Sequence, residues 1–388
     1  MQFIDLTAQQ KRIRPDLEKR ILAVLDHGQY IMGKEITELE KLLAEYCGTR
    51  HALSCSSGTD ALVLALMALN VGPGDAVFTT PFTFVATAEA IALVGATPVF
   101  VDIDPRTYNL DPKALDRAVA ALAVGDAKAH PLPAGAEKGL TPRGVIAVDL
   151  FGLPADYDAI NQVAQRRGLW VMEDAAQSFG ALYKGRRACS LSRVACTSFF
   201  PAKPLGGYGD GGMCFTDDDG LQDILKSLRV HGQGTDKYEN VRIGMNGRLD
   251  TLQAAVLLAK FAIFPEEAGL RQEVAARYTR LLSGHANLVT PHVPEDCQSV
   301  WAQYSLLTRA GDRDPLLLHL KNAGIPTAVY YPTPLHLQKA FAPLGYKPGD
   351  FPVSEDRAAR IFSVPMHPYL SARDQDAVVE ALLSFGAK

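Results

Sequence analysis

The chain has 388 residues and a formal net charge of −4 at pH 7, and 47% of its residues are hydrophobic and 21% charged. This length exceeds what a single ordinary core holds, so we expect two domains. The small negative net charge argues against a protein that binds nucleic acid or an anionic membrane surface. The six cysteines lack CxxC or Cys/His spacing, which predicts reduced thiols and no metal site.

The N-terminal sequence MQFIDLTAQQKRIRPDLEKR is mixed and polar, without the apolar centre of a signal peptide. No apolar run approaches the 18 residues that a membrane-spanning helix needs. We therefore expect a soluble, cytoplasmic protein. Apolar residues then recur at helical spacing over residues 16–30 and 36–46, which predicts two helices.

Strand-like and helix-like segments alternate over the next part of the chain. We expect helices at 56–70 and 86–95, and strands at 51–55, 75–81, 96–104, 144–152, 169–176, 194–200 and 211–217. Several strand segments are near-continuous apolar runs, typical of strands that are buried on both faces of a parallel sheet. Residues 124–143 are rich in Pro, Gly and Ala, which indicates a surface loop or insertion.

A long helical pattern covers residues 248–282 and is interrupted near Pro265, and a second α+β unit follows it. These patterns predict an α/β fold whose large domain has a mostly parallel sheet between helices. We place this large domain, with its N-terminal helices, at residues 1–255 and a smaller C-terminal α+β domain at 256–388.

The segment SSGTDAL (56–62) turns the chain from a predicted strand into a predicted helix. Unpaired backbone N–H groups and the positive end of the helix dipole make such a turn suitable for a phosphate. Taken alone, the turn is more typical of an ordinary N-cap. It has neither the P-loop spacing nor the GxGxxG spacing of a nicotinamide site.

Two further residues are candidates for a chemical role. Asp174 ends a buried strand, at the edge where open α/β sheets place their ligand sites, although capping is the commoner role of such an aspartate. Lys203 lies in TSFFPAKPLGGYGDGG (197–212), where glycine permits a close backbone approach and proline stiffens the chain. An enclosed lysine has its charged form disfavoured and can form a Schiff base, whereas alone it would more often be a surface residue.

Together, a phosphate-binding turn, a strand-end carboxylate and an enclosed lysine fit pyridoxal 5′-phosphate. The turn would hold the phosphate, Asp174 would keep the pyridine nitrogen protonated, and Lys203 would bond to the aldehyde. An aromatic residue should cover the ring, and Phe82 and Phe84 are the candidates in TTPFTFVAT. Either phenylalanine could instead belong to the core.

The chain resembles the DegT/StrS-like sugar-nucleotide aminotransferases, which have PLP fold type I with a seven-stranded sheet and belong to the aspartate aminotransferase superfamily. The motifs that carry the resemblance are spread along the chain: FIDL (3–6), HGQYIMG (27–33), SSGTDAL, PFTFVATAEA (81–90), VFVDIDPRTYNLDP (99–112), VMEDAAQSFGA (171–181), SFFPAKPLGGYGDGG (198–212), GMNGRLDTLQAA (244–255) and YYPTPLH (330–336).

The resemblance implies a role for each matching residue. Lys203 would be the Schiff-base lysine and the acid/base that moves the proton, and Asp174 would pair with the pyridinium nitrogen. The other implied cofactor contacts are Gln177 to the ring hydroxyl, Gly58, Thr59 and Ser198 to the phosphate, Phe84 stacking on the ring, and Asn246 reaching the phosphate of a neighbouring subunit. The implied substrate contacts are Arg248, Tyr330, Tyr331 and His336. A homodimer with shared active sites is therefore expected.

Within the family, the chain is most similar to aminotransferases that act on UDP-2-acetamido-2-deoxy-3-oxo-glucuronate with glutamate as amino donor, for surface polysaccharide or glycoconjugate biosynthesis. It departs from that subgroup at Tyr330, where the subgroup often has His. Lys at position 203 favours transamination, because related sugar dehydratases have His there. Two alternatives stay open. The substrate could be a 4-keto or another 3-keto sugar nucleotide, or the chain could be a regulatory PLP-fold protein without turnover. The sequence lacks the glycine-rich turn and downstream acidic residue of a nicotinamide oxidoreductase.

Overall fold

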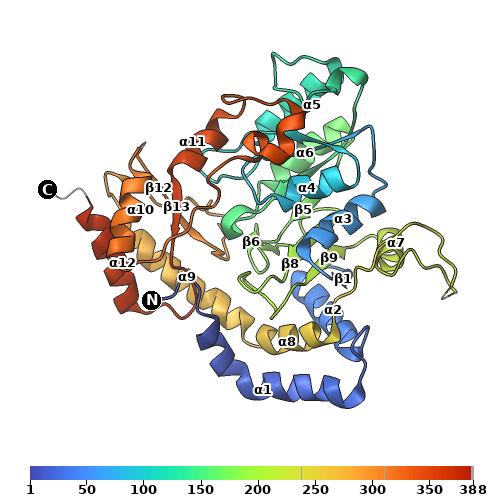
Figure 1. Ribbon diagram of the computed structural model, residues 1–388, viewed down its shortest axis with the longest axis horizontal. Helices are drawn as coiled ribbons and strands as arrows, with labels where there is room; N and C mark the ends of the chain where they lie inside the picture. The colour runs from blue at the N-terminus through green and yellow to red at the C-terminus, as the bar shows by residue number, and fades with distance from the viewer. Residues whose placement is uncertain (237, 310, 386–388) are drawn as a thin grey trace.

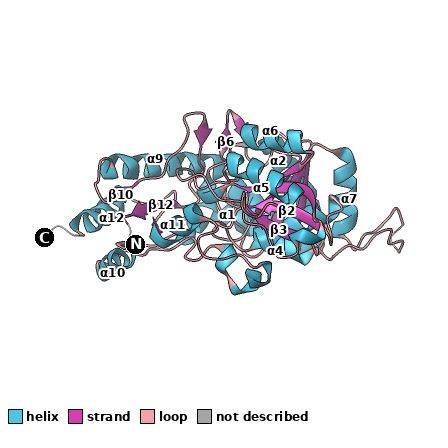
Figure 2. Ribbon diagram, turned by 90° about the horizontal axis from the view of Figure 1, so that it is seen from above, coloured by secondary structure: helices cyan, strands magenta, loops and turns pink. Residues whose placement is uncertain are grey.

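The computed structural model describes residues 1–236, 238–309 and 311–385, and it shows a large sheet between helices with a smaller unit beside it (Figures 1 and 2). The large sheet has seven strands, in the order β1 (His51–Cys55), β9 (Gly212–Thr216), β8 (Val194–Ser198), β5 (Trp170–Asp174), β4 (Thr141–Val148), β2 (Asp75–Thr79) and β3 (Thr97–Phe100). Strand β9 runs antiparallel to both of its neighbours, and the other pairs are parallel. The predicted mostly parallel sheet is confirmed.

Helices cover both faces of this sheet because its strands alternate buried apolar side chains between two faces. One face packs against α3 (Gly58–Ala68), α4 (Ala86–Leu93) and α7 (Asp219–Arg229). The other face packs against α5 (Pro112–Val124) and α6 (Tyr157–Arg167) at one end, and against α2 (Lys34–Cys47) and α8 (Thr251–Phe261) at the other. Helix α1 (Leu6–His27) lies along α8.

The direction of β9 is the exception in this mostly parallel sheet, and the sequence pattern of residues 211–217 did not predict it. Residues 199–211 return the chain from β8 to β9 without a helix. Backbone hydrogen bonds from Phe199 N to Gly211 O and from Gly207 N to Phe199 O, both 2.7 Å long, close this return. A parallel neighbour would need a crossover, usually a helix, so the short return forces an antiparallel pair.

The C-terminal part forms a smaller α+β unit, as predicted. Its sheet has the order β10 (Leu288–Val289), β12 (Tyr304–Thr308) and β13 (Ile361–Val364), all antiparallel. The helices of this part are α9 (Phe264–Leu282), α10 (Arg313–Asn322), α11 (Pro352–Arg360) and α12 (Ala372–Ser384). A third small sheet joins β11 (Cys297–Gln298), β6 (Leu182–Tyr183) and β7 (Arg186–Arg187), so it connects the C-terminal part to the large one.

The helical pattern at 248–282 divides into α8 and α9, with Pro265 in the first turn of α9, where its missing N–H costs nothing. The predicted domain boundary at residue 255 therefore lies inside α8. Helix α8 packs on α1 and α2, whereas α9 continues to the core of the C-terminal sheet. The division at residue 255 stays a prediction.

Residues 124–143 are more firmly attached than a surface loop would be. The His130 ring is buried, and its Nε2 donates a hydrogen bond of 2.8 Å to Phe100 O. The backbone N of Ala134 donates to Leu344 O at 2.8 Å. Residues 141–143 belong to β4. This segment therefore packs between the end of β3 and residues near 344, which composition alone did not indicate.

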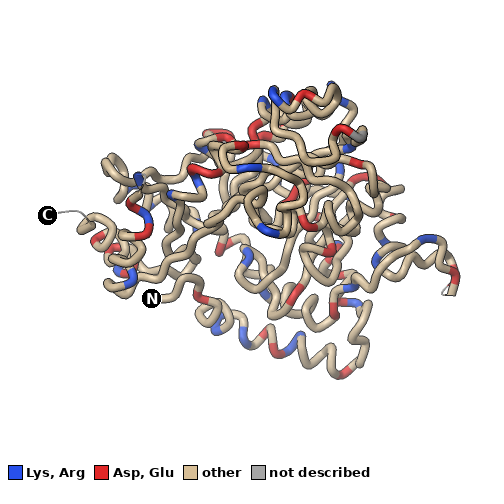
Figure 3. The backbone as a smooth tube through the Cα atoms, turned by 45° about the horizontal axis from the view of Figure 1, so that its top comes forward, with Lys and Arg blue, Asp and Glu red and all other residues tan. Residues whose placement is uncertain are grey.

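Positive and negative side chains are interspersed along the chain (Figure 3). The exposed Arg14–Glu18 and Arg20–Asp16 pairs on α1 are examples at i,i+4 spacing. In residues 1–236, 238–309 and 311–385, no helix is long and apolar enough to cross a membrane.

One ion pair is buried where α7, α2 and β1 meet. Arg229 Nη1 donates to Glu40 Oε1 at 2.5 Å and to Ser54 O at 2.9 Å. The same Glu40 oxygen accepts from the Ser54 backbone N and from its hydroxyl, each at 2.8 Å. Removing one partner of such a pair leaves the other charge buried without compensation.

We expect Arg229→Met to lower the free energy of unfolding by about 3 kcal/mol, because Glu40 would lose its buried counter-charge. Chemical denaturation of the purified protein measures this change. Arg193→Met is the matched control, since Arg193 pairs with Asp218 at 3.1 Å on the surface and its loss should cost about 1 kcal/mol or less. Equal losses for both variants would contradict the assignment of the buried pair.

Candidate active site

A cavity of about 460 Å³ opens at the carboxyl ends of the parallel strands, where open α/β sheets place their ligand sites. Residues that follow β1, β2, β5 and β8, and the last residue of β4, Val148, all reach it. The lining residues include Ser57, Gly58, Thr59, Thr83, Phe84, Thr87, Asp174, Gln177, Ser198, Lys203, Gln303, Tyr330 and Tyr331. The topology therefore brings nine predicted site residues into one space, although 273 positions separate Gly58 from Tyr331.

The SSGTDAL turn forms one wall of the cavity. Helix α3 begins at Gly58, and the Ser57 hydroxyl caps it by accepting from Asp60 N at 3.0 Å. A Cβ on Gly58 would lie 2.6 Å from Ser198 Cβ, so only glycine permits the two turns to meet. The positive end of the α3 dipole and the Ser198 hydroxyl thus lie side by side, an arrangement that suits a phosphate.

Asp174 lies buried at the end of β5 and faces the cavity. Its Oδ2 accepts a hydrogen bond of 2.7 Å from the Thr87 hydroxyl, and its Oδ1 accepts one of 3.2 Å from Ala176 N. Burial raises the pKa of Asp174, while these two hydrogen bonds and the charge of Lys203 act in the opposite direction. The contacts hold the carboxylate in place and favour its ionised form.

Lys203 projects into the cavity from the short return between β8 and β9. Its backbone N donates to Phe200 O at 2.8 Å, and the return is tight enough that a Cβ on Gly206 would lie 2.5 Å from that same oxygen. Burial lowers the pKa of the Lys203 amine, and nearby Asp174 raises it. The amine is therefore more often neutral, and more nucleophilic, than a surface lysine.

Gln177 is fixed by two contacts. Its Oε1 accepts from Phe151 N at 2.9 Å, and its Nε2 donates to the Tyr331 hydroxyl at 3.2 Å. The Phe84 ring is 53% exposed and lies 6.3 Å from the Tyr331 ring, so it can cover a flat ligand from the open side. Phe82, the other aromatic candidate, is a core residue.

Three predicted site residues lie elsewhere. Asn246 is exposed, Arg248 is half-buried with its Nε unpartnered among the described residues, and neither lines the cavity. The His336 side chain is fully buried, with Nε2 3.1 Å from Glu355 Oε1 and the ring against Phe351. Contact of His336 with a substrate stays a prediction that this geometry does not support.

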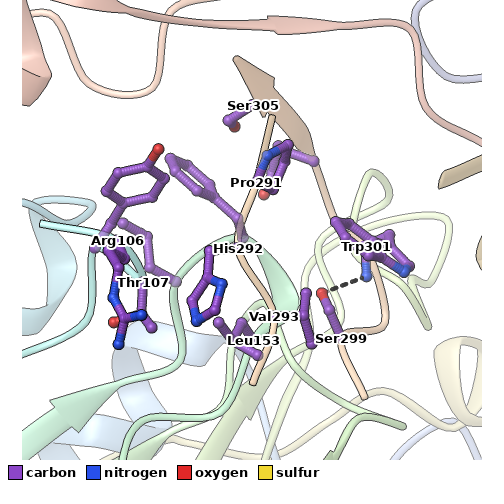
Figure 4. A pocket seen from close by; sticks show the side chains of 13 residues that line it. Arg106, Thr107, Leu153, Pro291, His292, Val293, Ser299, Trp301 and Ser305 are labelled. Carbon is purple, nitrogen blue, oxygen red and sulfur yellow. Dashed lines mark hydrogen bonds between the residues drawn. The ribbon is translucent and has the colours of Figure 1, made fainter. Parts of the chain in front are cut away.

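A second hollow, of about 20 Å³, lies next to the cavity and is lined by Arg106, His292 and Trp301 among others (Figure 4). Figure 4 shows the Ser299 hydroxyl beside the Trp301 backbone N, which donates to it at 3.0 Å. Gln303 lines both the hollow and the cavity. The hollow has room for about one water molecule, so we do not assign a ligand to it.

The residues of the cavity fit pyridoxal 5′-phosphate. The meeting of Gly58 and Ser198 at a helix N-terminus suits the phosphate, the buried carboxylate of Asp174 suits a cationic ring nitrogen, and the enclosed amine of Lys203 suits an aldehyde. The volume leaves room for a second ligand. Within the described part of the chain, no group of three His, Cys, Asp or Glu could hold a metal ion.

The model of the DegT/DnrJ/EryC1/StrS aminotransferase family matches residues 11–383. The chain belongs to this family. It is 50% identical over 384 residues to the UDP-2-acetamido-2-deoxy-3-oxo-D-glucuronate aminotransferase of Pseudomonas aeruginosa, which covers 98% of this chain and 99% of that one. It is 43% identical over 385 residues to a pleiotropic regulatory protein of Geobacillus stearothermophilus, covering 99% of this chain and 98% of the other.

Solved structures of similar chains agree with the fold. A family aminotransferase from Brucella abortus has a TM-score of 0.93 and 47% identity, with complete coverage of both chains. DesV of S. venezuelae, in complex with a ketimine intermediate, has a TM-score of 0.92 and 36% identity, covering 100% of this chain and 98% of that one. NtdA of Bacillus subtilis, with bound cofactor PMP, has a TM-score of 0.85 and 28% identity, covering 98% and 82%.

These likenesses confirm the predicted fold, family and cofactor. This DegT-family chain is a PLP-dependent sugar-nucleotide aminotransferase. Sequence reasoning missed Thr87 as the residue that orients Asp174, and it also missed Gln303. Thr87 lies in the quoted motif PFTFVATAEA, one helical turn after Thr83, so its position on the cavity side of α4 could have been inferred.

We expect Gly58→Ala to weaken the affinity for pyridoxal phosphate by about tenfold or more, because the added methyl would push the α3 turn away from Ser198. Titration of the cofactor-free protein, followed by absorbance, measures the dissociation constant. Gly269→Ala on α9 is the control, since a Cβ there meets no atom within 4 Å. An unchanged affinity in Gly58→Ala would contradict the phosphate assignment.

Proposed function

We propose that this enzyme transfers the amino group of L-glutamate to the 3-keto carbon of a UDP-linked N-acetylhexosaminuronate, for surface polysaccharide or glycoconjugate biosynthesis. Two observations support this choice of substrate. The Pseudomonas aeruginosa aminotransferase, named for a substrate of this kind, is 50% identical over nearly the whole chain. The cavity of about 460 Å³, lined by Tyr330 and Tyr331, would hold a sugar beside the cofactor.

The observation that carries the chemistry is the enclosure of Lys203 and Asp174 in one cavity. Pyridoxal phosphate, when bound, supplies an electron-withdrawing ring and the carbon that carries the amino group. Asp174 would keep a proton on the ring nitrogen, and Gln177 Nε2 would donate to the ring hydroxyl. Gly58, Thr59 and Ser198 would hold the phosphate, and Phe84 would cover the ring.

Lys203 is the proposed acid/base. Its Nζ would take the proton that leaves the Cα of the amino donor and deliver it to the cofactor carbon that keeps the amino group, before water releases the donor as a keto acid. Burial lowers the pKa of this amine, so the neutral form that accepts a proton is more available than in a surface lysine. The same amine would deliver a proton in the opposite direction when the keto sugar is the acceptor.

We also propose a homodimer with shared active sites. Asn246 and Arg248 lie outside the cavity of their own chain, and the Arg248 Nε is buried without a partner among the described residues. Exposed large apolar side chains flank this segment, at residues 30–32 and at Val241 and Ile243. A backbone bridge between Ile31 and Asp250 joins the two regions. A group of large exposed apolar side chains is typical of an interface.

A 4-keto or another 3-keto sugar nucleotide is the alternative substrate, since Tyr330 stands where the glucuronate subgroup often has His. A regulatory role without turnover is the second alternative, given the relative of that name in Geobacillus stearothermophilus. The enclosure of Asp174 and Lys203 in one cavity favours catalysis, because a binding protein has no need of such a pair of ionisable groups.

With the enzyme in its pyridoxamine phosphate form, we expect UDP-2-acetamido-2-deoxy-3-oxo-D-glucuronate to restore the visible absorption band of the pyridoxal form. We expect a rate about 100-fold or more above that with a UDP-linked 4-keto sugar, because the carbonyl must meet Lys203 in one position. Stopped-flow absorbance measures both rates.

Lys203→Ala is the control for this experiment, since it should show neither the visible band nor its recovery. Recovery with only the 4-keto sugar would contradict the proposed substrate. A wild-type protein that binds the cofactor but responds to neither sugar nor to glutamate would instead support the regulatory alternative.

Mixing the Lys203→Ala and Arg248→Ala variants should restore activity if active sites are shared between subunits. Random exchange makes half of the dimers mixed, and one of the two sites in each mixed dimer is intact, so we expect about a quarter of wild-type kcat. Steady-state assays after subunit exchange measure this, with each variant alone as control. Mixed dimers that form on a sizing column but have no activity would contradict the proposal.

A further inference from the structure

Two buried hydroxyl groups lie behind the carboxylate of Asp174. Thr83 is 2% exposed and Thr87 is 1% exposed, and both line the cavity together with Asp174. The Thr87 hydroxyl donates to Asp174 Oδ2 at 2.7 Å, and the Thr83 hydroxyl lies 3.3 Å from that of Thr87. The three side chains therefore form a short chain of hydrogen bonds that ends on the proposed partner of the ring nitrogen.

The chemistry of these groups fixes the direction of the chain. A hydroxyl has one proton to donate, whereas an ionised carboxylate only accepts. Thr87 gives its proton to Asp174, so in its contact with Thr83 it must be the acceptor. A proton on Asp174 Oδ2 would reverse this order. The arrangement therefore favours the ionised carboxylate.

Both hydroxyls are held in place by the start of α4. Thr87 is the second residue of α4, and Thr83 lies in the turn that leads into this helix. The apolar side of α4 packs on the sheet through Ala86, Ala90 and Ile91. The positive end of the helix dipole lies at the same first turn, and it also favours a negative charge there.

We propose that Thr87 is a positioning residue for the cofactor and that Thr83 supports it. The ordered hydroxyl pair holds the Asp174 carboxylate ionised and in a fixed orientation before the ring nitrogen arrives. The inference rests on the proposed pairing of Asp174 with that nitrogen, and it names what keeps the carboxylate ready for it.

The groups around Asp174 act in both directions. Burial raises the pKa of Asp174, and three influences oppose it: the hydrogen bond from Thr87, which is the largest of them, the one from Ala176 N, and the charge of Lys203. The other ionisable groups that interact electrostatically with this carboxylate are Asp149, Tyr157, Cys196 and Tyr331. Loss of the Thr87 hydroxyl should therefore raise the pKa of Asp174.

The direct test is a titration of Asp174 in the cofactor-free full chain, followed by ¹³C NMR of labelled aspartate carboxyl carbons and assigned by comparison with Asp174→Asn. We expect Thr87→Val, which keeps the shape but loses the donor, to raise the pKa of Asp174 by about one unit or more. Thr87→Ser should keep the wild-type value. Thr216→Val is the matched control, because it removes a buried hydroxyl of the same sheet that donates to Arg193 O at 2.8 Å, and it should change nothing.

Thr83→Val tests the order of the chain. Alone, it should raise the pKa of Asp174 by less than Thr87→Val does, because Thr83 acts only through Thr87. Combined with Thr87→Val, it should cause no further shift. Additive shifts in the double variant would contradict the ordered pair.

Cofactor affinity separates this role from a purely structural one. 1-Deazapyridoxal phosphate has a carbon in place of the ring nitrogen, so the ratio of the affinities for pyridoxal phosphate and this analogue isolates the pairing with Asp174. We expect the ratio to fall as the pH drops through the pKa of Asp174, and to fall about one pH unit higher in Thr87→Val than in wild type. A local loss of packing would weaken both compounds alike. Absorbance titrations of the cofactor-free protein measure both affinities.

Thr87→Ala, which cannot crowd the site, should behave as Thr87→Val. An unshifted Asp174 pKa in both folded variants would overturn the inference. A ratio that Asp174→Asn does not change would contradict the pairing of Asp174 as well. Neither experiment involves a sugar, so failure of the proposed transamination would appear separately, as wild-type protein with the expected ratios but no amino transfer.

Discussion

The removal of Lys203 and Asp174 from water at the carboxyl edge of the sheet is the constraint on which the rest of the site depends. Burial disfavours the charged form of each group, so the lysine tends to lose its proton and the aspartate to keep one. Their mutual attraction opposes both tendencies. Thr87 and the backbone N of Ala176 add hydrogen bonds that favour the carboxylate. A cationic ring nitrogen would replace the lysine as its partner.

The architecture around this pair holds polar groups in place at a site that is removed from water. Parallel strands end together at one edge, so the turns after β1, β5 and β8 meet without long connections. Glycine at positions 58 and 206 lets backbone approach backbone. The helix α3 contributes its dipole to the same point. Rigid elements thus supply the electrostatic field, and two aromatic residues that line the cavity, Phe84 and Phe200, are more than half exposed to solvent.

Buried charge also joins distant parts of the chain. Arg229 connects α7 to α2 and β1 through Glu40, and Glu267 connects α9 to α1 through Gln9. The second of these contacts borders a small hollow that Lys203 also lines. Such pairs contribute little net stability compared with apolar packing, but each is costly to break from one side.

Much of the fold could be predicted from local patterns in the sequence. The apolar runs at residues 144–152 and 169–176 indicated buried parallel strands, and Pro265 indicated the break between two helices. The direction of β9 did not follow, because it depends on the absence of a crossover helix after β8 rather than on the composition of the strand. The attachment of residues 124–143 through His130 was equally hidden, since it is formed with Phe100 and Leu344.

By itself, the sequence determined the residue types of the site: a glycine turn at a helix start, an aspartate at a strand end, and a lysine in a stiff loop. Their motifs also identified the family. Only the tertiary structure decided which residues share the cavity, because burial and distance depend on contacts between segments far apart in the chain. It placed Thr87 on Asp174 and buried His336 against Glu355.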